Sequence, residues 1–447
     1  MESNDKNKDL ALFEAAMQKV YGPYNASASV AEHTKWEPGN AGGHRGRYLW
    51  TDAFGVLNFI TLSREASSSS YSSDTTSSSS TSSPTLSAST GYLRLARRLA
   101  ETVHEVLGRE REREPEPPAF DMDSYTRIEF RERARLPGAT NAAPLNGGLR
   151  IGKKDGAGPD GDGMYHHYLT LWMYALDCLA RATGEVKWNS LAVQLAEAIH
   201  PRFVRLRHRT RRTTGSGVGA DNENRGNEDE DVVCESMVWK ISTDMRRVLV
   251  ASKGHLDDVT GYVVFRLLRD TARKFREKKK SSSGAKVAAS EPEDDVLTEE
   301  IEQYERIMAH SDLSLSGDPL DLGMGLWIAH FDCSASWSRE MSSQALEIAR
   351  ERFLAHAQKP LTAASRLHRL AFREFGACLG IKCYGADLEQ LMDGVATVLD
   401  IWEKKMIGNE GGDGSDLDLR PISLVMYAAA LIPGGKFPLY LLFMPHG

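Results

Sequence analysis

The stretch GMYHHYLTLWMYALDCLA, from Gly163 to Ala180, begins with polar and aromatic residues and then becomes apolar and rich in small residues. An apolar run of this kind predicts a helix that is buried on most of its sides. The same pattern recurs in five other segments, which are Thr51–Phe59, Gly254–Leu268, Asp318–Phe331, Leu367–Ile381 and Asp418–Ile432. Six buried helices, each with a polar amino-terminal end, predict a ring around a central cleft.

Amphipathic segments alternate with the buried ones. In Trp188–Val204, apolar residues recur at the spacing of one helix face, as at Leu191, Leu195 and Ile199. The other amphipathic segments are Asp9–Gly22, Tyr92–Gly108, Leu297–Ala309, Ser338–Ala355 and Asp387–Lys405. We expect these helices to pack outside the buried ones. The alternation predicts an all-α fold, an (α/α)6 toroid of six helical hairpins that the first and last helices close.

The chain of 447 residues is expected to form one domain that spans residues 1–447. Three low-complexity segments, at 67–90, 205–231 and 274–295, are expected to be disordered insertions, because they bury too little apolar surface to offset their ordering entropy. Between Met237 and Gly254 the sequence alternates, which predicts a small β-hairpin near the cleft.

Composition and short motifs exclude several classes of function. A net charge of −7 argues against a nucleic-acid-binding protein. No apolar run is long enough to span a membrane or to serve as a signal peptide, and the five cysteines are scattered, so we expect a cytoplasmic protein with free thiols. HExxH, paired CxxC and phosphate-loop motifs are absent, so neither a metal nor a cofactor is expected. The sequence carries no signal that sets the oligomeric state.

Three motifs resemble six-hairpin glycosidase-like proteins. These are RGRYLWTDAFGVLNFITL (Arg45–Leu62), the helix start GDGMYHHY (Gly161–Tyr168) and the partner helix YLRLARRLAETVHEVLG (Tyr92–Gly108). That superfamily includes inverting glycoside hydrolases and the N-acylglucosamine and cellobiose 2-epimerases. The resemblance covers the chain apart from the insertions. It implies a site for a carbohydrate or another small molecule at the amino-terminal ends of the inner helices.

The first group of candidate site residues lies at the start of the segment that contains Thr51–Phe59. Arg45, Arg47, Trp50 and Asp52 stand close together there. A Trp ring can stack on a sugar face, while Arg and Asp side chains bond to its hydroxyls. The alternative for Asp52 is a structural one, because Asp is a common cap at a helix start.

The second group contains histidine and aromatic residues. Tyr165, His166 and His167 follow a Gly/Asp-rich loop, Trp239 lies in the predicted hairpin, and His255 directly follows that hairpin. Adjacent residues on a helix point about 100° apart, so we expect only one of His166 and His167 to face the cleft. Histidine is the usual acid/base side chain, which makes His166 and His255 catalytic candidates, while Tyr165, His167 and Trp239 are candidates for contact with substrate.

Acidic residues at the next helix starts form the third group. Asp257 and Asp258 share a helix start with His255, and two acids there exceed what capping needs, so Asp258 is a catalytic candidate. Asp318 followed by Pro319 is typical of a helix cap, whereas Asp321, one turn later, is a candidate for contact with substrate.

Charged residues inside the last two apolar segments complete the set. Arg373 and Glu374 lie in the apolar stretch AFREFGACLG, and Arg420 begins the last segment. A carboxyl group in apolar surroundings has a raised pKa, which suits a general acid, so Glu374 is the first candidate. If Glu374 is paired with Arg373, it is instead a structural anchor, and Asp258 is then the better candidate.

Three functions follow from these residues. Inverting hydrolysis needs two carboxyl groups roughly 6.5–9.5 Å apart, which Asp52, Asp258 and Glu374 can supply. A sugar 2-epimerase needs an acid and a base, for which His166 or His167 and His255 are candidates. The third alternative is a toroid that binds a ligand without catalysis. An enzyme is preferred to a binding toroid, because both the carboxylates and the aromatic residues are present. Hydrolysis is preferred to epimerisation, because the late inner helices lack a histidine at the place that the resemblance implies for the epimerases.

Overall fold

The computed structural model describes residues 2–71, 84–111, 133–158, 160–210, 231–282, 295–359, 369–385, 388–407 and 419–434. The structure is mostly helical, with 67% helix and 4% strand, which confirms the all-α prediction. Within these ranges, no helix has both the length and the apolar character needed to cross a bilayer. Four of the five cysteines, Cys178, Cys333, Cys378 and Cys383, form no disulfide bond.

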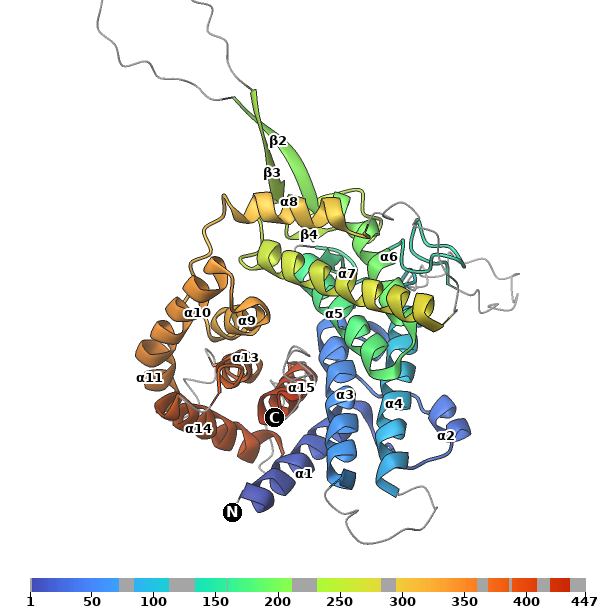
Figure 1. Ribbon diagram of the computed structural model, residues 1–447, viewed down its shortest axis with the longest axis vertical. Helices are drawn as coiled ribbons and strands as arrows, with labels where there is room; N and C mark the ends of the chain where they lie inside the picture. The colour runs from blue at the N-terminus through green and yellow to red at the C-terminus, as the bar shows by residue number, and fades with distance from the viewer. Residues whose placement is uncertain are drawn as a thin grey trace, which may run out of the picture.

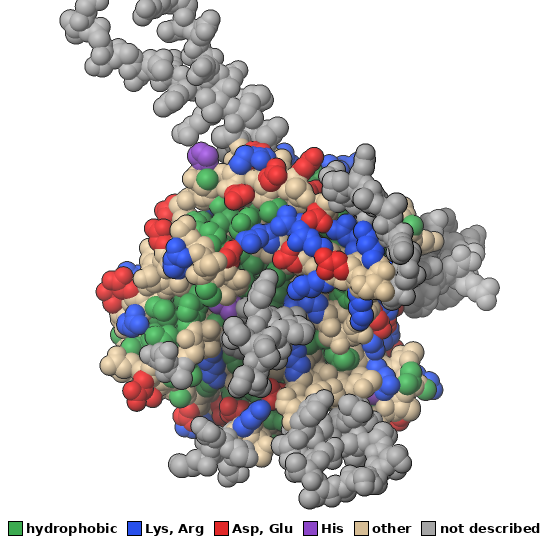
Figure 2. Space-filling view, in the orientation of Figure 1, with side chains coloured by type: hydrophobic (Ala, Val, Ile, Leu, Met, Phe, Trp, Pro, Cys, Tyr) green, Lys and Arg blue, Asp and Glu red, His purple; other side chains and the backbone are tan. Residues whose placement is uncertain are grey.

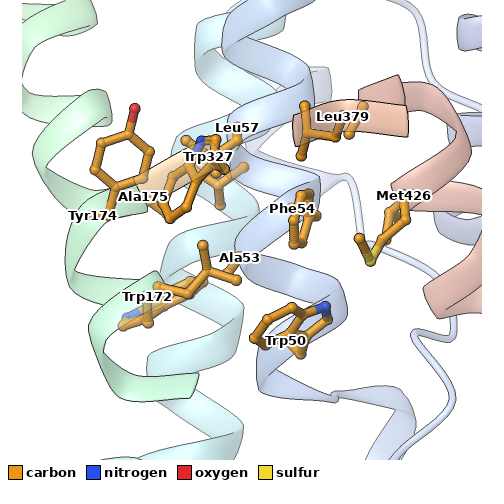
Figure 3. Packing of buried hydrophobic residues seen from close by; sticks show 14 of the residues in the cluster. Trp50, Ala53, Phe54, Leu57, Trp172, Tyr174, Ala175, Trp327, Leu379 and Met426 are labelled. Carbon is orange, nitrogen blue, oxygen red and sulfur yellow. The ribbon is translucent and has the colours of Figure 1, made fainter. Parts of the chain in front are cut away.

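Helices occupy the positions predicted for the six buried segments. They are α3 (Leu49–Tyr71), α5 (His166–Thr183), α7 (Asp257–Ser282), α9 (Pro319–Ala329), α13 (Ala371–Lys382) and α15 (Arg420–Leu431). Each contacts the next one in chain order, and α15 contacts α3. Figure 3 shows how Phe54 and Leu57 of α3, Trp327 of α9, Leu379 of α13 and Met426 of α15 lie in one core. These inner helices are therefore buried because they share this core.

A second set of helices packs against the first. It consists of α1 (Glu2–Tyr21), α4 (Pro84–Leu107), α6 (Val186–Phe203), α8 (Thr298–Met308), α10 (Ser336–Ile348) and α14 (Glu389–Met406). In chain order, α4 contacts α3, α6 contacts α5, α8 contacts α7, α10 contacts α9 and α14 contacts α13, while α1 contacts α15. Figure 1 shows α9, α13 and α15 within an arc that includes α10, α14 and α1. A π-helical turn, η3 (Ala349–Phe353), and α11 (Leu354–Ala357) continue α10.

Small residues let two inner helices approach closely. A Cβ atom on Gly323 of α9 would lie 1.9 Å from the carbonyl oxygen of Gly376 on α13. Likewise, a Cβ atom on Gly380 would lie 2.2 Å from the carbonyl oxygen of Gly323. The small-residue character of these segments therefore has a packing reason.

Short strands lie beside the start of α5. β1 (Met164–Tyr165), β4 (Lys240–Ile241) and β5 (Val248–Val250) form an antiparallel sheet in the order β1-β4-β5. The pairing of β4 with β5 confirms the predicted hairpin. In this sheet Tyr165 pairs with Lys240, so the hairpin places Trp239 close to the start of α5.

The predicted insertions extend too far at their ends. Residues 67–71 belong to α3, 84–90 to α4 and 274–282 to α7, while 205–210 belong to β2 (Val204–Thr210), which pairs with β3 (Asp231–Met237). Figure 1 shows the β2–β3 ribbon extending from the body of the protein beside α8. The remaining parts, 72–83, 211–230 and 283–294, lie outside the described residues.

Hydrogen bonds and ion pairs explain why the polar ends of these segments are helical. Near the end of α3, the hydroxyl oxygen of Ser67 lies 2.7 Å from that of Ser89 on α4. On α7, Arg276 pairs with Asp295 at 2.5 Å, and Arg273 pairs with the same carboxylate. Figure 2 shows basic and acidic side chains interspersed over the surface around α7. Low sequence complexity therefore did not by itself mark where regular structure ends.

Candidate functional site

A pocket of about 540 Å³ lies at the amino-terminal ends of the inner helices. All six of these helices contribute lining residues from their first turns, as with Trp50 of α3 and Ile422 of α15. Seven of the predicted site residues line it, namely Trp50, Tyr165, His167, Trp239, His255, Asp321 and Arg373. The other seven lie outside its lining, namely Arg45, Arg47, Asp52, His166, Asp258, Glu374 and Arg420.

Five rings form what we call the aromatic wall of the pocket, which consists of Tyr48, Trp50, Tyr165, Tyr168 and Trp239. Tyr165 and Trp239 are stacked, with ring centroids 5.0 Å apart and planes 27° apart. Trp50 packs against Tyr168 at 5.2 Å, and the hydroxyl groups of Tyr48 and Tyr168 are hydrogen-bonded at 2.8 Å. These contacts fix the rings, so the wall is a rigid apolar surface with polar edges.

His167 is held at the edge of this wall. The indole Nε1 of Trp239 donates a hydrogen bond to its Nδ1 over 3.1 Å. Burial lowers the pKa of His167 to about 4, so the ring is neutral at neutral pH. Because Nδ1 accepts a hydrogen bond, the proton of the neutral ring is on Nε2. His167 is therefore a hydrogen-bond donor at Nε2.

Asp257 is the buried carboxylate of the pocket. Its side chain is only 2% exposed. The Gly254 N–H donates to its Oδ2 over 3.1 Å, and its Oδ1 lies 3.7 Å from Nδ1 of both His166 and His167. Burial alone would raise the pKa of Asp257, but the nearby imidazoles of His166 and His167 and the hydrogen bond from the Gly254 N–H lower it overall. Asp257 is therefore ionised at neutral pH.

Asp258, the predicted catalytic residue, points elsewhere. Lys253 Nζ and the hydroxyl of Ser311 each lie 2.5 Å from its Oδ2. It is fully buried and ties the start of α7 to the segment after α8. Of this adjacent pair, Asp257 lines the pocket and Asp258 does not, because a step of about 100° separates the two side chains.

The two other histidines of the prediction differ in position. His166 is fully buried behind the pocket, with its Nε2 at 2.7 Å from the hydroxyl of Tyr304 on α8. His255 lines the pocket, and its buried Nε2 has no hydrogen-bond partner among the described residues. As expected from the helical step, only His167 of the adjacent pair lines the pocket.

Asp52 and Arg47 form a buried ion pair, with Arg47 Nη1 at 3.2 Å from Asp52 Oδ1. The Tyr21 hydroxyl and the Tyr48 N–H also donate to the Asp52 carboxylate, each over 3.3 Å. Burial raises the pKa of Asp52 to about 6 against the opposing effect of Arg47. Both residues lie outside the pocket lining and stabilise the start of α3. Arg45 is exposed in the short 3₁₀ turn that precedes this helix.

Glu374 is a structural anchor, which corrects its prediction as the first catalytic candidate. Both oxygens accept from Arg369 over 2.6 Å, and His356 and Trp402 add hydrogen bonds of 2.9 Å. Burial raises the pKa of Glu374, but the bonds from Arg369, His356 and Trp402 outweigh that effect and lower it. The expected raised pKa is therefore wrong, because the sequence did not reveal these partners. The predicted partner Arg373 is not the one that binds it.

Arg373 lines the pocket and pairs with Asp318. Asp318 also caps α9 by accepting from the Leu320 N–H over 2.9 Å, as the sequence predicted. Asp321 accepts from the Ser316 hydroxyl over 2.7 Å. Arg420 lies outside the lining and donates to the Met406 carbonyl over 3.1 Å.

Lys153 is a pocket residue that sequence reasoning missed. Its Nζ donates to the Tyr165 hydroxyl over 3.3 Å. The loop that carries it is fixed by Asp162, which accepts from Arg150 over 2.7 Å and from the Gly163 N–H over 3.0 Å. The Gly/Asp-rich loop that follows Lys153 was the available signal, but its Asp162 holds the loop together and does not line the pocket.

Within the described residues, no group of three or more His, Cys, Asp or Glu side chains is placed to hold a metal ion. No protein-family model matches the chain, and neither a curated protein nor a solved structure gives a match. The resemblance to six-hairpin glycosidase-like proteins thus stays a prediction.

Proposed function

We propose that this protein is an (α/α)6 toroid of the six-hairpin glycosidase-like kind that binds a carbohydrate in its pocket. The observation that carries the proposal is the aromatic wall beside the polar side chains of Asp257, Asp321 and His255. Sugars present flat C–H faces and hydroxyl edges, so a site for them combines ring surfaces with donors and acceptors. The cycle of contacts among the inner helices, with one outer helix on each, supports the toroid.

The reaction that we propose is glycoside hydrolysis by Asp257 and Asp321, because they are the described carboxylates that line the pocket. Asp257, with its lowered pKa, suits the base that activates water. Asp321 is then the acid that protonates the leaving oxygen. This pair replaces Asp52, Asp258 and Glu374, which are not in the pocket lining and whose carboxylates are already paired with a cation.

A second candidate reaction is 2-epimerisation, which is favoured by the presence of two histidines in the pocket lining. His255 has a buried Nε2 without a partner among the described residues, which suits a base. His167, whose neutral ring carries its proton on Nε2, can donate a hydrogen bond to the sugar oxygen that gains negative charge when His255 removes the proton.

Turnover of a sugar panel by paired variants distinguishes these reactions. For hydrolysis, we expect Asp257→Asn to lower kcat by on the order of 10²-fold or more. The matched neighbour Asp258→Asn should keep the kcat of its folded fraction. For epimerisation, His255→Gln should abolish activity, whereas Asp321→Asn should retain it. If the folded wild-type protein neither binds nor converts any sugar in the panel, the carbohydrate proposal is wrong.

We also infer a cytoplasmic location. Cys333 and Cys378, which form no disulfide bond, support it, because disulfides are rare in reducing compartments. Microscopy of the full chain with a fluorescent tag tests this inference, and a signal confined to the secretory pathway contradicts it.

A further inference from the structure

We propose that the ligand of this pocket is a sugar that carries an anionic group, and that Lys153 is the cation that pairs with that group. The proposal rests on the proposed carbohydrate function and adds a substrate class to it. A carboxylate or a phosphate satisfies the same chemistry, and the experiment below separates the two.

Positive charge gathers at the Tyr165 end of the pocket. Lys153 Nζ lies 5.5 Å from the centroid of the Tyr165 ring, and Lys240 Nζ lies 5.1 Å from the same centroid. Lys240 is fully buried, and its Nζ donates to the Gly161 carbonyl over 2.6 Å. Burial, followed by repulsion from Lys153, lowers the pKa of Lys240. An anion bound at this end would therefore relieve repulsion between two ammonium groups.

The other cations of the pocket already have close carboxylate partners. Lys253 pairs with Asp258 at 2.5 Å, and Arg373 pairs with Asp318. The carboxylate paired with Lys153 is Asp160, at 4.0 Å, and its side chain is fully exposed. An exposed pair of that kind contributes little, so a ligand anion can replace it at small cost.

Asp162 is the buried carboxylate near the Tyr165 end of the pocket, and its charge is already balanced. Asp162 accepts from Arg150 over 2.7 Å and from Arg111 over 3.2 Å, so two guanidinium groups already neutralise it. The charge of Lys153 is thus the pocket charge that is least compensated by its surroundings.

Two indole groups supply an independent observation. Trp50 and Trp327 line the pocket and are 5% and 2% exposed, and neither Nε1 has a hydrogen-bond partner among the described residues. Buried donors of this kind nearly always have an acceptor. A ligand rich in acceptor oxygens supplies one, and an anionic sugar has more of them than a neutral sugar.

Titration calorimetry on the wild-type protein tests the proposal with matched sugars. The probes are D-glucose, D-glucuronate and D-glucose 6-phosphate, followed by the neutral and uronate members of the galacto series. We expect an anionic sugar to bind at least about tenfold more tightly than its neutral counterpart at low salt, with the preference shrinking as salt screens the charge. Tighter binding of the uronate identifies a carboxylate, and tighter binding of the sugar phosphate identifies a phosphate.

Variants then assign the preference to Lys153. Lys153→Met should remove the preference for the anionic sugar, and Lys153→Arg should restore most of it. Lys154→Met is the matched control, because it removes the same charge from an exposed neighbour outside the pocket lining. Circular dichroism confirms that each variant is folded.

The outcomes separate the two proposals. Equal binding of neutral and anionic sugars overturns the anionic class and leaves the carbohydrate function standing. A preference that persists in Lys153→Met overturns the role of Lys153. Failure of every sugar to bind overturns the carbohydrate function and the anionic class together.

Discussion

The indole Nε1 of Trp239 donates to Nδ1 of His167 over 3.1 Å, and the two rings are nearly parallel, at 16°. Trp239 comes from the hairpin and His167 from the start of α5, so this bond joins two segments distant in sequence at the pocket. It fixes the tautomer of His167, and it therefore decides whether the Nε2 atom of that ring donates or accepts a hydrogen bond.

Changing Trp239 to Phe should alter that tautomer, because Phe keeps a ring and removes the N–H donor. We expect nitrogen-detected NMR at pH 7 to show His167 protonated on Nε2 in the wild type and a mixture of tautomers in Trp239→Phe. His330 is an internal control, because its Nδ1 bonds to the Trp327 carbonyl and should carry the proton in both proteins. Protonation of His167 on Nδ1 in the wild type would contradict the assignment.

Changing Glu374 to Gln should destabilise the protein and leave the pocket intact. Arg369 is only 4% exposed, so the variant leaves a buried charge without its partner, at a cost of about 3–5 kcal/mol. Urea unfolding measures this loss. The matched control is Asp400→Asn, which breaks the exposed pair with Lys404 and should cost no more than about 1 kcal/mol. Equal losses in the two variants would show that Glu374 is not an anchor.

His200 should make the protein less stable in acid. It is 3% exposed, and burial lowers its pKa from 6.5 to about 4. Below pH 6.5 the unfolded chain therefore binds a proton that the folded protein does not, and stability falls as the pH drops towards about 4. The loss is on the order of 3 kcal/mol at about 1.4 kcal/mol per pKa unit. Urea unfolding at several pH values should show a shallower dependence in His200→Gln, and an unchanged slope would refute this.

Asp52 should change the pH dependence of stability in the direction opposite to that of His200. Burial raises its pKa from 3.8 to about 6, so the folded protein holds its proton more tightly than the unfolded chain does. Its contribution is complete below pH 3.8 and is lost as the pH rises through about 6, by roughly 3 kcal/mol. Asp52→Asn should therefore remove a loss of stability on raising the pH from 4 to 6. The readout is the slope of stability against pH, because the variant also weakens the pair with Arg47 and so changes the stability itself. A steeper loss on raising the pH in the variant would reverse the assigned sign.

The sequence by itself determined the helices and the end of the fold where the pocket lies. Apolar runs such as Gly163–Ala180 and Asp318–Phe331 identify α5 and α9 directly, because a helix with apolar residues on most sides has to be buried. Polar residues at these helix starts indicated the amino-terminal ends as the site. The pocket lies there, and Trp50, His167 and Asp321 line it.

Only the tertiary structure decided which residue of each adjacent pair enters the pocket. His167, Asp257 and Arg373 line it. Their neighbours His166, Asp258 and Glu374 do not, and they bond instead to Tyr304, Lys253 and Arg369. A step of about 100° separates such neighbours, and the rotation of a helix is set by the helices that pack against it. Lys153 depends on tertiary structure in the same way, because it lies on a loop that has no periodic pattern and is held by Arg150 and Asp162.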